Sequence, residues 1–311
     1  MLIFHLYYVF FIFFGTLLSI MSMNWFWSWF GMELCLFSFF PLMLSYTITY
    51  LNYIVDCKYF LIQSLGSIFL FLGLYMMKID YFTYLFVVGF IMKLGLYPFL
   101  SYMFDLSLGL TWDIFWIFSS LIKFSSMYFF SMFMMNLMTI VFVVFFFTSI
   151  YSLLFMITTN ILKIFIMGSS YIQIFYVYLI IVNLCDFVIY YFMYLYVSYM
   201  VVYMMFLGNF EYFSDLYMNN SFFSLYFVIS MLSYMGFPFF FGFYMKLYIL
   251  SSLCMYMYFF FFLIMILSFY SYIRLMCLIF LNLNVYVYKF FDLKLLVEFY
   301  LGFFSILMLL W

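Results

Sequence analysis

The sequence predicts an all-α polytopic membrane protein with about 11 transmembrane helices, two of which are broken by glycine and proline. Of the 311 residues, 73% are hydrophobic and only 6% are charged, whereas a soluble domain carries about 25% charged residues. Long apolar runs, such as 164–185 and 187–210, contain no charge and are long enough for a span of roughly 20 residues. They lack the alternation of apolar and polar residues that barrel strands require.

The helices follow from the apolar runs between clusters of polar residues. Much of the charge lies in short connections near 56–58, 78–80, 211–220 and 289–294. Because no linker rich in Pro, Gly or Ser divides the chain, we expect a single transmembrane domain, residues 1–311. The first apolar run has no basic stretch and no small-residue cleavage site, so we expect it to be retained as a helix. The expected helices are 2–20, 24–46, 59–78, 81–104, 111–133, 137–157, 166–185, 187–208, 220–245, 247–283 and 294–311.

Composition also excludes several classes of function. The net charge of −1 provides no basic face for nucleic acid. The single histidine, His5, is expected at the membrane interface and not in a metal or redox site. The cysteines show no CxxC pairing and lie in or beside apolar stretches, so they predict neither disulfides nor a metal site. They are Cys35, Cys57, Cys185, Cys254 and Cys277.

Four ionisable residues lie near the centres of otherwise apolar spans: Glu33, Lys93, Lys123 and Lys246. A charged side chain at mid-bilayer costs on the order of 2.5–3.5 kcal/mol even on insertion scales. Such residues are rare without a use, and they usually face the bundle interior or a water-filled cavity. The four are therefore the candidate functional residues of the chain.

Burial favours the neutral form of an amine or a carboxyl group. A buried lysine can therefore gain and lose a proton near neutral pH, which an arginine cannot do. Three lysines in mid-span positions favour a proton relay. The alternative for each of them is a static ion pair that holds the bundle together. Default structural roles are expected for the other charges: an interfacial or snorkelling position for Lys163 and Arg274, and helix-end positions for Asp105, Asp113 and Asp186.

Two helices carry a glycine and a proline close to one of these lysines. Gly95 and Pro98 follow the first lysine, and Gly236 and Pro238 precede the last. A proline inside a helix removes one backbone hydrogen bond and clashes with the carbonyl four residues before it. In a membrane this carbonyl needs water, a side chain or an ion. Interrupted hydrophobic segments of this kind are typical of transport sites, and an ordinary kink is the alternative.

Five segments, taken in chain order, resemble NADH dehydrogenase subunit 2, the family of antiporter-like membrane subunits of mitochondrial respiratory complex I. Each segment alone is a weak match in so apolar a chain, but the ordered set with its aligned charges is fairly specific. The segments are WFGMELCLFSFFPLM at 29–43, KYFLIQSLGSIFLFLG at 58–73, MKLGLYPFLSYMFDLSLGLTW at 92–112, MLSYMGFPFFFGFYMKL at 231–247 and SFYSYIRL at 268–275.

The resemblance implies an antiporter-like fold and a proton path through Glu33, Lys93, Lys123 and Lys246. It implies that the glutamate tunes Lys93, that Lys123 passes protons along a hydrated axis, and that Lys246 communicates with a neighbouring subunit. It places the chain in the mitochondrial inner membrane as a subunit of NADH:ubiquinone oxidoreductase, in contact with lipids, other complex I subunits and neighbouring antiporter-like subunits. NADH, FMN, iron–sulfur clusters and ubiquinone would then be bound by other subunits, with no cofactor in this chain.

The sequence departs from the family pattern at three positions. Leu100 and Gln173 stand where the family commonly has histidine, and Phe239 replaces the second proline of a Pro-Pro pair. These departures argue against a relay assisted by histidine but leave the lysines in place. Two other functions stay open: a stand-alone cation/proton secondary transporter, and a structural membrane subunit whose buried charges only pair and specify packing.

Overall fold

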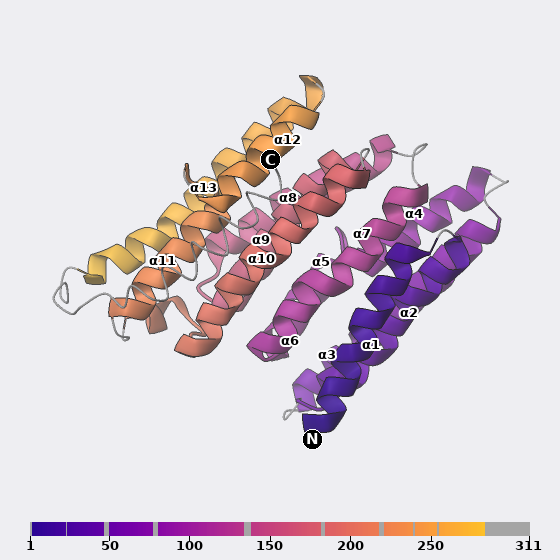
Figure 1. The fold of residues 1–311 in the computed structure, drawn as a ribbon, viewed down its shortest axis with the longest axis horizontal. Coiled ribbons are helices and arrows are strands. Elements are labelled where there is room, and N and C mark those ends of the chain that lie inside the picture. The colour runs from indigo at the N-terminus through magenta and orange to yellow at the C-terminus, as the bar shows by residue number, and fades with distance from the viewer. Residues whose placement is uncertain are drawn as a thin grey trace.

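The computed structural model describes residues 2–22, 24–46, 50–76, 80–133, 138–181, 184–217, 221–238, 240–253 and 255–283. These residues form an all-helical bundle (Figure 1). The α-helices are α1 (Leu2–Met21), α2 (Trp25–Leu44), α3 (Tyr50–Tyr75), α4 (Asp80–Leu94), α5 (Leu100–Gly109), α6 (Trp112–Trp116), α7 (Ile122–Phe133), α8 (Met138–Thr158), α9 (Leu162–Ile180), α10 (Leu184–Gly208), α11 (Ser221–Met235), α12 (Phe241–Ser252) and α13 (Met255–Leu283). A π-helical turn, η1 (Ile117–Leu121), joins α6 to α7, and a 3₁₀ turn, η2 (Phe213–Tyr217), follows α10.

Length and composition make the bundle a multi-pass membrane protein. In the described part of the chain, seven helical segments are long and apolar enough to cross a bilayer, and one of them runs through α6, η1 and α7. Large apolar side chains such as Leu6, Phe10 and Phe259 are more than 60% exposed on the outside of the bundle. A surface of this kind is stable in lipid, where the backbone groups are satisfied within helices.

The chain runs from α1–α3 at one end of the bundle to α11–α13 at the other, with α9 and α10 between them (Figure 1). Helix α9 is the centre: all 19 of its residues are buried, and it contacts α5, α8, α10, α12 and α13. A helix that is apolar on nearly every side suits such a position. The polar residues in the middle of α9, Ser169, Ser170 and Gln173, therefore point into the protein interior.

Both predicted helix breaks are present. The first separates α4 from α5, and the second separates α11 from α12. At each break a glycine adopts a positive φ, 66° at Gly95 and 76° at Gly236, a conformation that side chains with a Cβ rarely adopt. The prediction of a boundary at residue 246 was wrong, because α12 continues past it to Ser252 and the last described helix begins only at Met255.

Other differences from the sequence prediction concern buried charges. Helix α3 begins at Tyr50, well before the expected residue 59, so Asp56 lies in a helix and is buried instead of lying in a connection. Lys163 was expected at the interface, but it is buried with its Nζ 3.8 Å from Glu211 Oε1. The predicted helix 294–311, the connection 289–294 and Phe239 lie outside the described residues.

Candidate functional site: a line of buried lysines

The four ionisable residues singled out in the sequence lie on four different helices. Glu33 is on α2, Lys93 is the penultimate residue of α4, Lys123 is near the start of α7, and Lys246 is in the middle of α12. Each is at most 7% exposed. All four charged groups are therefore enclosed by the bundle and do not snorkel to the headgroups.

Glu33 and Lys93 form an ion pair. The Lys93 ammonium donates to Glu33 Oε1 at 2.7 Å. Because both groups are removed from water, each is stabilised in its charged form by the other, and removal of either partner would leave a buried charge without compensation. The sequence placed both residues at mid-span but left open whether they meet. The packing of α2 against α3 and of α3 against α4 brings them together.

At the first break, neutral side chains from other elements donate to carbonyls at the end of α4, and the Met92 carbonyl also accepts a hydrogen bond of 3.2 Å from the Gly95 N–H. Gln63 on α3 donates to the Lys93 carbonyl at 3.0 Å. Tyr102 on α5 donates to the Met92 carbonyl at 2.9 Å, and Tyr171 on α9 donates to the Leu94 carbonyl at 3.2 Å. These bonds satisfy backbone groups that would otherwise be costly to bury.

Lys123 lies directly after the π-helical turn, a type of irregularity that is frequent at functional sites. Its Nζ donates to Ser170 Oγ at 3.0 Å, lies 3.6 Å from the centroid of the Tyr171 ring and is 3.8 Å from Met167 Sδ. Within the described residues it forms no ion pair. Its surroundings are therefore a hydroxyl, an aromatic face and a thioether, which tolerate both the charged and the neutral amine.

Lys246 lies across the second break. Its Nζ donates to the Met235 carbonyl at the end of α11 and lies 4.7 Å from the centroid of the Phe269 ring on α13. It too forms no ion pair among the residues that the structure describes. A Cβ on Gly236 would lie 2.8 Å from Lys246 Cδ, so the glycine leaves the room through which the lysine reaches the carbonyl.

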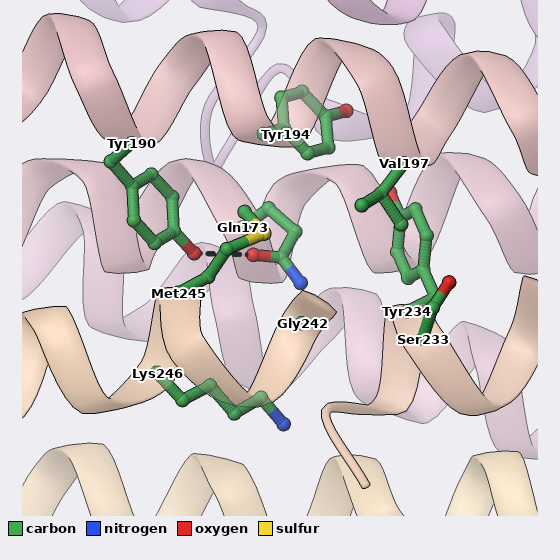
Figure 2. Close-up of a pocket in the computed structure, with 9 residues that line it drawn as sticks. All are labelled: Gln173, Tyr190, Tyr194, Val197, Ser233, Tyr234, Gly242, Met245 and Lys246. Atoms are coloured by element: carbon green, nitrogen blue, oxygen red, sulfur yellow. Dashed lines mark hydrogen bonds between the residues drawn. The ribbon is translucent and has the colours of Figure 1, made fainter. Parts of the chain in front are cut away.

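Two small polar cavities lie beside the outer lysines. Lys93, Gln63, Ser125 and Ser126 line one of about 10 Å³, and Lys246 lines a second of about 10 Å³ (Figure 2). A space of this size with polar walls holds about one water molecule. The Lys93 cavity reaches α7, because Ser126 on its wall also donates to the carbonyl of Lys123. A water in this cavity would therefore lie between Lys93 and helix α7, which carries Lys123.

Gln173 lies on the wall of the Lys246 cavity, where the family resemblance expects a histidine. Its Oε1 accepts a hydrogen bond of 2.6 Å from the Tyr190 hydroxyl on α10, drawn as a dashed line in Figure 2. The polar character of this position is therefore retained, although an amide replaces a titratable ring.

Sequence reasoning missed the neutral residues that surround the lysines. Gln63, Tyr102, Ser170, Tyr171 and Tyr190 all form hydrogen bonds inside the bundle. Of these residues, Gln63 could have been singled out from the sequence, because an amide at mid-span is uncommon in so apolar a helix. The tyrosines carried no signal, since 35 of them are spread over the chain.

Two other charged residues, Arg274 and Asp186, join helices through hydrogen bonds. Arg274 on α13 donates to the Ile157 carbonyl and, at 3.1 Å, to Asn160 Oδ1, after the end of α8. Asp186, in the first turn of α10, accepts a hydrogen bond of 2.5 Å from Tyr248 on α12. Asp105 and Asp113 are exposed. Among the described residues, no cluster of His, Cys, Asp or Glu could hold a metal ion.

The sequence matches no protein-family model, and no curated protein matches it. Chains of solved structures do match this chain in fold. A chain of respiratory complex I from Thermus thermophilus, solved with bound aureothin, superposes with a TM-score of 0.76 at 16% identity, covering 88% of this chain and 69% of that one. A chain of the Mrp complex from Dietzia sp. DQ12-45-1b gives a TM-score of 0.70 at 15% identity, covering 86% and 59%. This likeness confirms the fold class predicted from the sequence: the chain has the fold of proteins found in a respiratory complex I and in an Mrp complex.

Proposed function

We propose that the chain is a proton-translocating, antiporter-like membrane subunit of complex I, the NADH:ubiquinone oxidoreductase. In this proposal it lies in the mitochondrial inner membrane beside other complex I subunits, including neighbouring antiporter-like ones. The chain itself carries no redox chemistry, and NADH, FMN, iron–sulfur clusters and ubiquinone are bound by the partner subunits. Its share of the enzyme is to pass protons along Glu33, Lys93, Lys123 and Lys246 and the water between them.

The observation that carries the proposal is the environment of Lys123. A structural lysine in a membrane is expected to keep a carboxylate beside it, whereas this ammonium has a hydroxyl and an aromatic face. Its neighbours on either side in the proposed path are also lysines, each beside a cavity with room for about one water. A line of amines separated by water and hydroxyls can hand on protons, because each amine can exist with or without its proton.

Glu33 would control the entry of a proton into this line. At 2.7 Å it holds the proton on Lys93 by direct attraction. Two unit charges about 4 Å apart interact by ~4 kcal/mol at an effective dielectric constant of 20. A small movement of α2 relative to α4 therefore changes the proton affinity of Lys93 by a large factor. Separation of the pair would release the proton towards the cavity and Lys123.

The test is Lys123→Met in the intact complex, reconstituted in liposomes. Methionine keeps the length of the side chain and removes the titratable amine. We expect proton pumping to be abolished or sharply reduced, while assembly on native gels is unchanged because no ion pair is lost. Lys58→Met is the matched control, since Lys58 is an exposed lysine of the same chain. Normal pumping by the Lys123 variant would overturn the proposed function.

The similarity to a chain of the Mrp complex favours one alternative, a cation/proton transporter that works without an NADH dehydrogenase. The same lysines would then couple proton movement to a cation. Isolation of the native complex distinguishes the two functions. Co-purification with NADH-oxidising activity supports the complex I subunit, whereas cation-dependent proton exchange by a complex without that activity supports the alternative.

A further inference from the structure

A row of buried hydroxyl groups lies between Lys123 and the cavity beside Lys246. It begins at Ser170 on α9, which accepts the hydrogen bond of Lys123 at 3.0 Å. The hydroxyl of Tyr194 on α10 lies close to that of Ser170, although Ser170 itself donates to the Met167 carbonyl at 2.7 Å. All three residues are at most 3% exposed, so the row is sealed from both lipid and bulk water.

The next hydroxyl group of the row after Tyr194 belongs to Tyr234 on α11. The two rings meet edge to face with centroids 6.4 Å apart, and both residues lie on the wall of the Lys246 cavity. The Tyr194 hydroxyl also lies 3.4 Å from the Ser119 carbonyl in the π-helical turn. The Tyr194 hydroxyl can therefore donate its hydrogen to the Ser119 carbonyl when no proton is being transferred.

Tyr234 lies on the wall of the Lys246 cavity (Figure 2). Its hydroxyl lies close to those of Ser169 and Tyr194, but it is buried without a hydrogen-bond partner of normal geometry among the described residues. A buried unpaired hydroxyl is costly, and a cavity with room for about one water lies beside it. A water there would satisfy Tyr234 and face Lys246 across the same cavity.

We propose that Tyr194 and Tyr234 form a hydroxyl bridge that carries protons between Lys123 and Lys246. The proposal rests on the proposed function, which needs a connection between these two amines. The Lys123 ammonium gives a proton to Ser170, whose own hydrogen moves to Tyr194. The hydrogen of Tyr194 moves to Tyr234, that of Tyr234 to the cavity water, and a hydrogen of the water to neutral Lys246. Each oxygen keeps its number of hydrogens, and only the charge moves from one lysine to the other.

Gln173 and Tyr190 line the same cavity but suit this role less well. The Tyr190 hydroxyl is committed to Gln173 Oε1 at 2.6 Å. An amide holds both of its hydrogens on nitrogen and accepts on oxygen, so it cannot receive a proton at one atom and release one from the same atom. A hydroxyl does both at one oxygen. The tyrosine pair, completed by a water in the cavity, is therefore the better route, and Gln173 orients one wall of it.

The test removes the hydroxyls and keeps the rings. The intact complex carrying Tyr194→Phe and Tyr234→Phe together is reconstituted in liposomes, and its proton translocation is measured. We expect a fall of about tenfold or more, because a positioned acid–base group contributes ~10²–10⁴-fold to proton transfer and stray water replaces part of it. The matched control is Tyr176→Phe, which removes another buried hydroxyl without a hydrogen-bond partner, on a ring that packs against Phe261 and does not line the Lys246 cavity.

A second pair of variants separates proton transfer from packing. Tyr234→His retains a group that donates and accepts a proton, whereas Tyr234→Phe retains the shape. A bridge predicts faster translocation with histidine than with phenylalanine, and a packing role predicts the reverse. If the double variant fails to assemble, these single substitutions still distinguish a proton-transfer role of Tyr234 from a packing role.

Lys123→Met in the same preparation separates the two hypotheses. If the lysine variant stops pumping and the double tyrosine variant pumps at the original rate, the bridge is overturned and the proposed function stands. If the lysine variant pumps normally, the proposed function fails and the bridge fails with it. Loss of pumping in both, with Tyr176→Phe unaffected, supports the bridge.

Discussion

The two broken helices place a lysine beside a backbone break in different ways. At the first break, Lys93 turns away from the open carbonyls and pairs with Glu33 at 2.7 Å. The carbonyls are bonded by Gln63, Tyr102 and Tyr171, which belong to other helices. At the second break, Lys246 itself donates to the open carbonyl of Met235. One lysine is held by a charge and the other by the backbone.

This difference teaches what each amine needs in order to release its proton. In the proposed function, Lys93 would release its proton when its distance from Glu33 increases, so the control would be electrostatic and would act through the position of α2. A neutral Lys246 can still donate to a carbonyl, because an amine retains N–H groups. In the proposed function, the second site would therefore change its charge without breaking the contact between α11 and α12. The first site is suited to gating, and the second to passing protons on.

The largest expected effect is on the first site. Lys93→Met leaves Glu33 as a buried carboxylate without a partner, and loss of one member of a buried pair costs about 3–5 kcal/mol. We expect lower yield and a lower melting temperature of the isolated complex. Glu33→Gln combined with Lys93→Met removes both charges and should recover most of the lost stability, but not the pumping. Equal stability of the single and double variants would show that the ion pair does not hold this site.

The second site should respond more weakly. Lys246→Met removes the donor to the Met235 carbonyl, and a buried acceptor left without a partner costs about 1–3 kcal/mol. Because no acidic group pairs with Lys246 among the described residues, no second substitution of a carboxylate should be needed to restore assembly. The melting temperature of this variant should therefore lie between those of the unmodified complex and Lys93→Met. A loss as large as that of Lys93→Met would contradict the contrast between the sites.

Sequence reasoning located both sites because their causes are local. A lysine in an apolar run, and a glycine near a proline, can be recognised without knowledge of the fold, since the costs of burial and of a broken helix are paid at those residues. The contact between Glu33 and Lys93 could not be predicted in the same way. Both were known to lie at mid-depth, but their separation depends on how α2 and α4 pack about α3.

Boundaries were harder to predict in the second half of the chain. Between Phe241–Ser252 and Met255–Leu283 only the pair Ser251 and Ser252 marks the boundary, and pairs of serines also occur inside other helices of this chain, such as Ser169 and Ser170 in α9. The π-helical turn had no local signal either, because Ile117–Leu121 has the composition of any other stretch of these helices. The partners of Lys123 lie on α9, and only tertiary packing brings them to it.

The smallest expected effect comes from the two glycines, and it tests the same contrast through the backbone. Gly95→Ala and Gly236→Ala each place a Cβ on a residue with positive φ, at a cost of about 1–2 kcal/mol. The new atoms meet different neighbours. The Cβ added at Gly95 would lie 2.4 Å from Met103 Cγ and Cε. The flexible methionine side chain can move to make room for it.

At Gly236 the new Cβ lies 2.8 Å from Lys246 Cδ and 2.9 Å from its Cε. This side chain cannot withdraw without losing the Met235 carbonyl. We therefore expect similar small losses of melting temperature in the two variants, but slower pumping only in Gly236→Ala. The comparison is made on reconstituted complexes with matched amounts of assembled protein. If Gly95→Ala slowed pumping as much, the backbone at the first break would also be positioning its lysine, and the two sites would be alike.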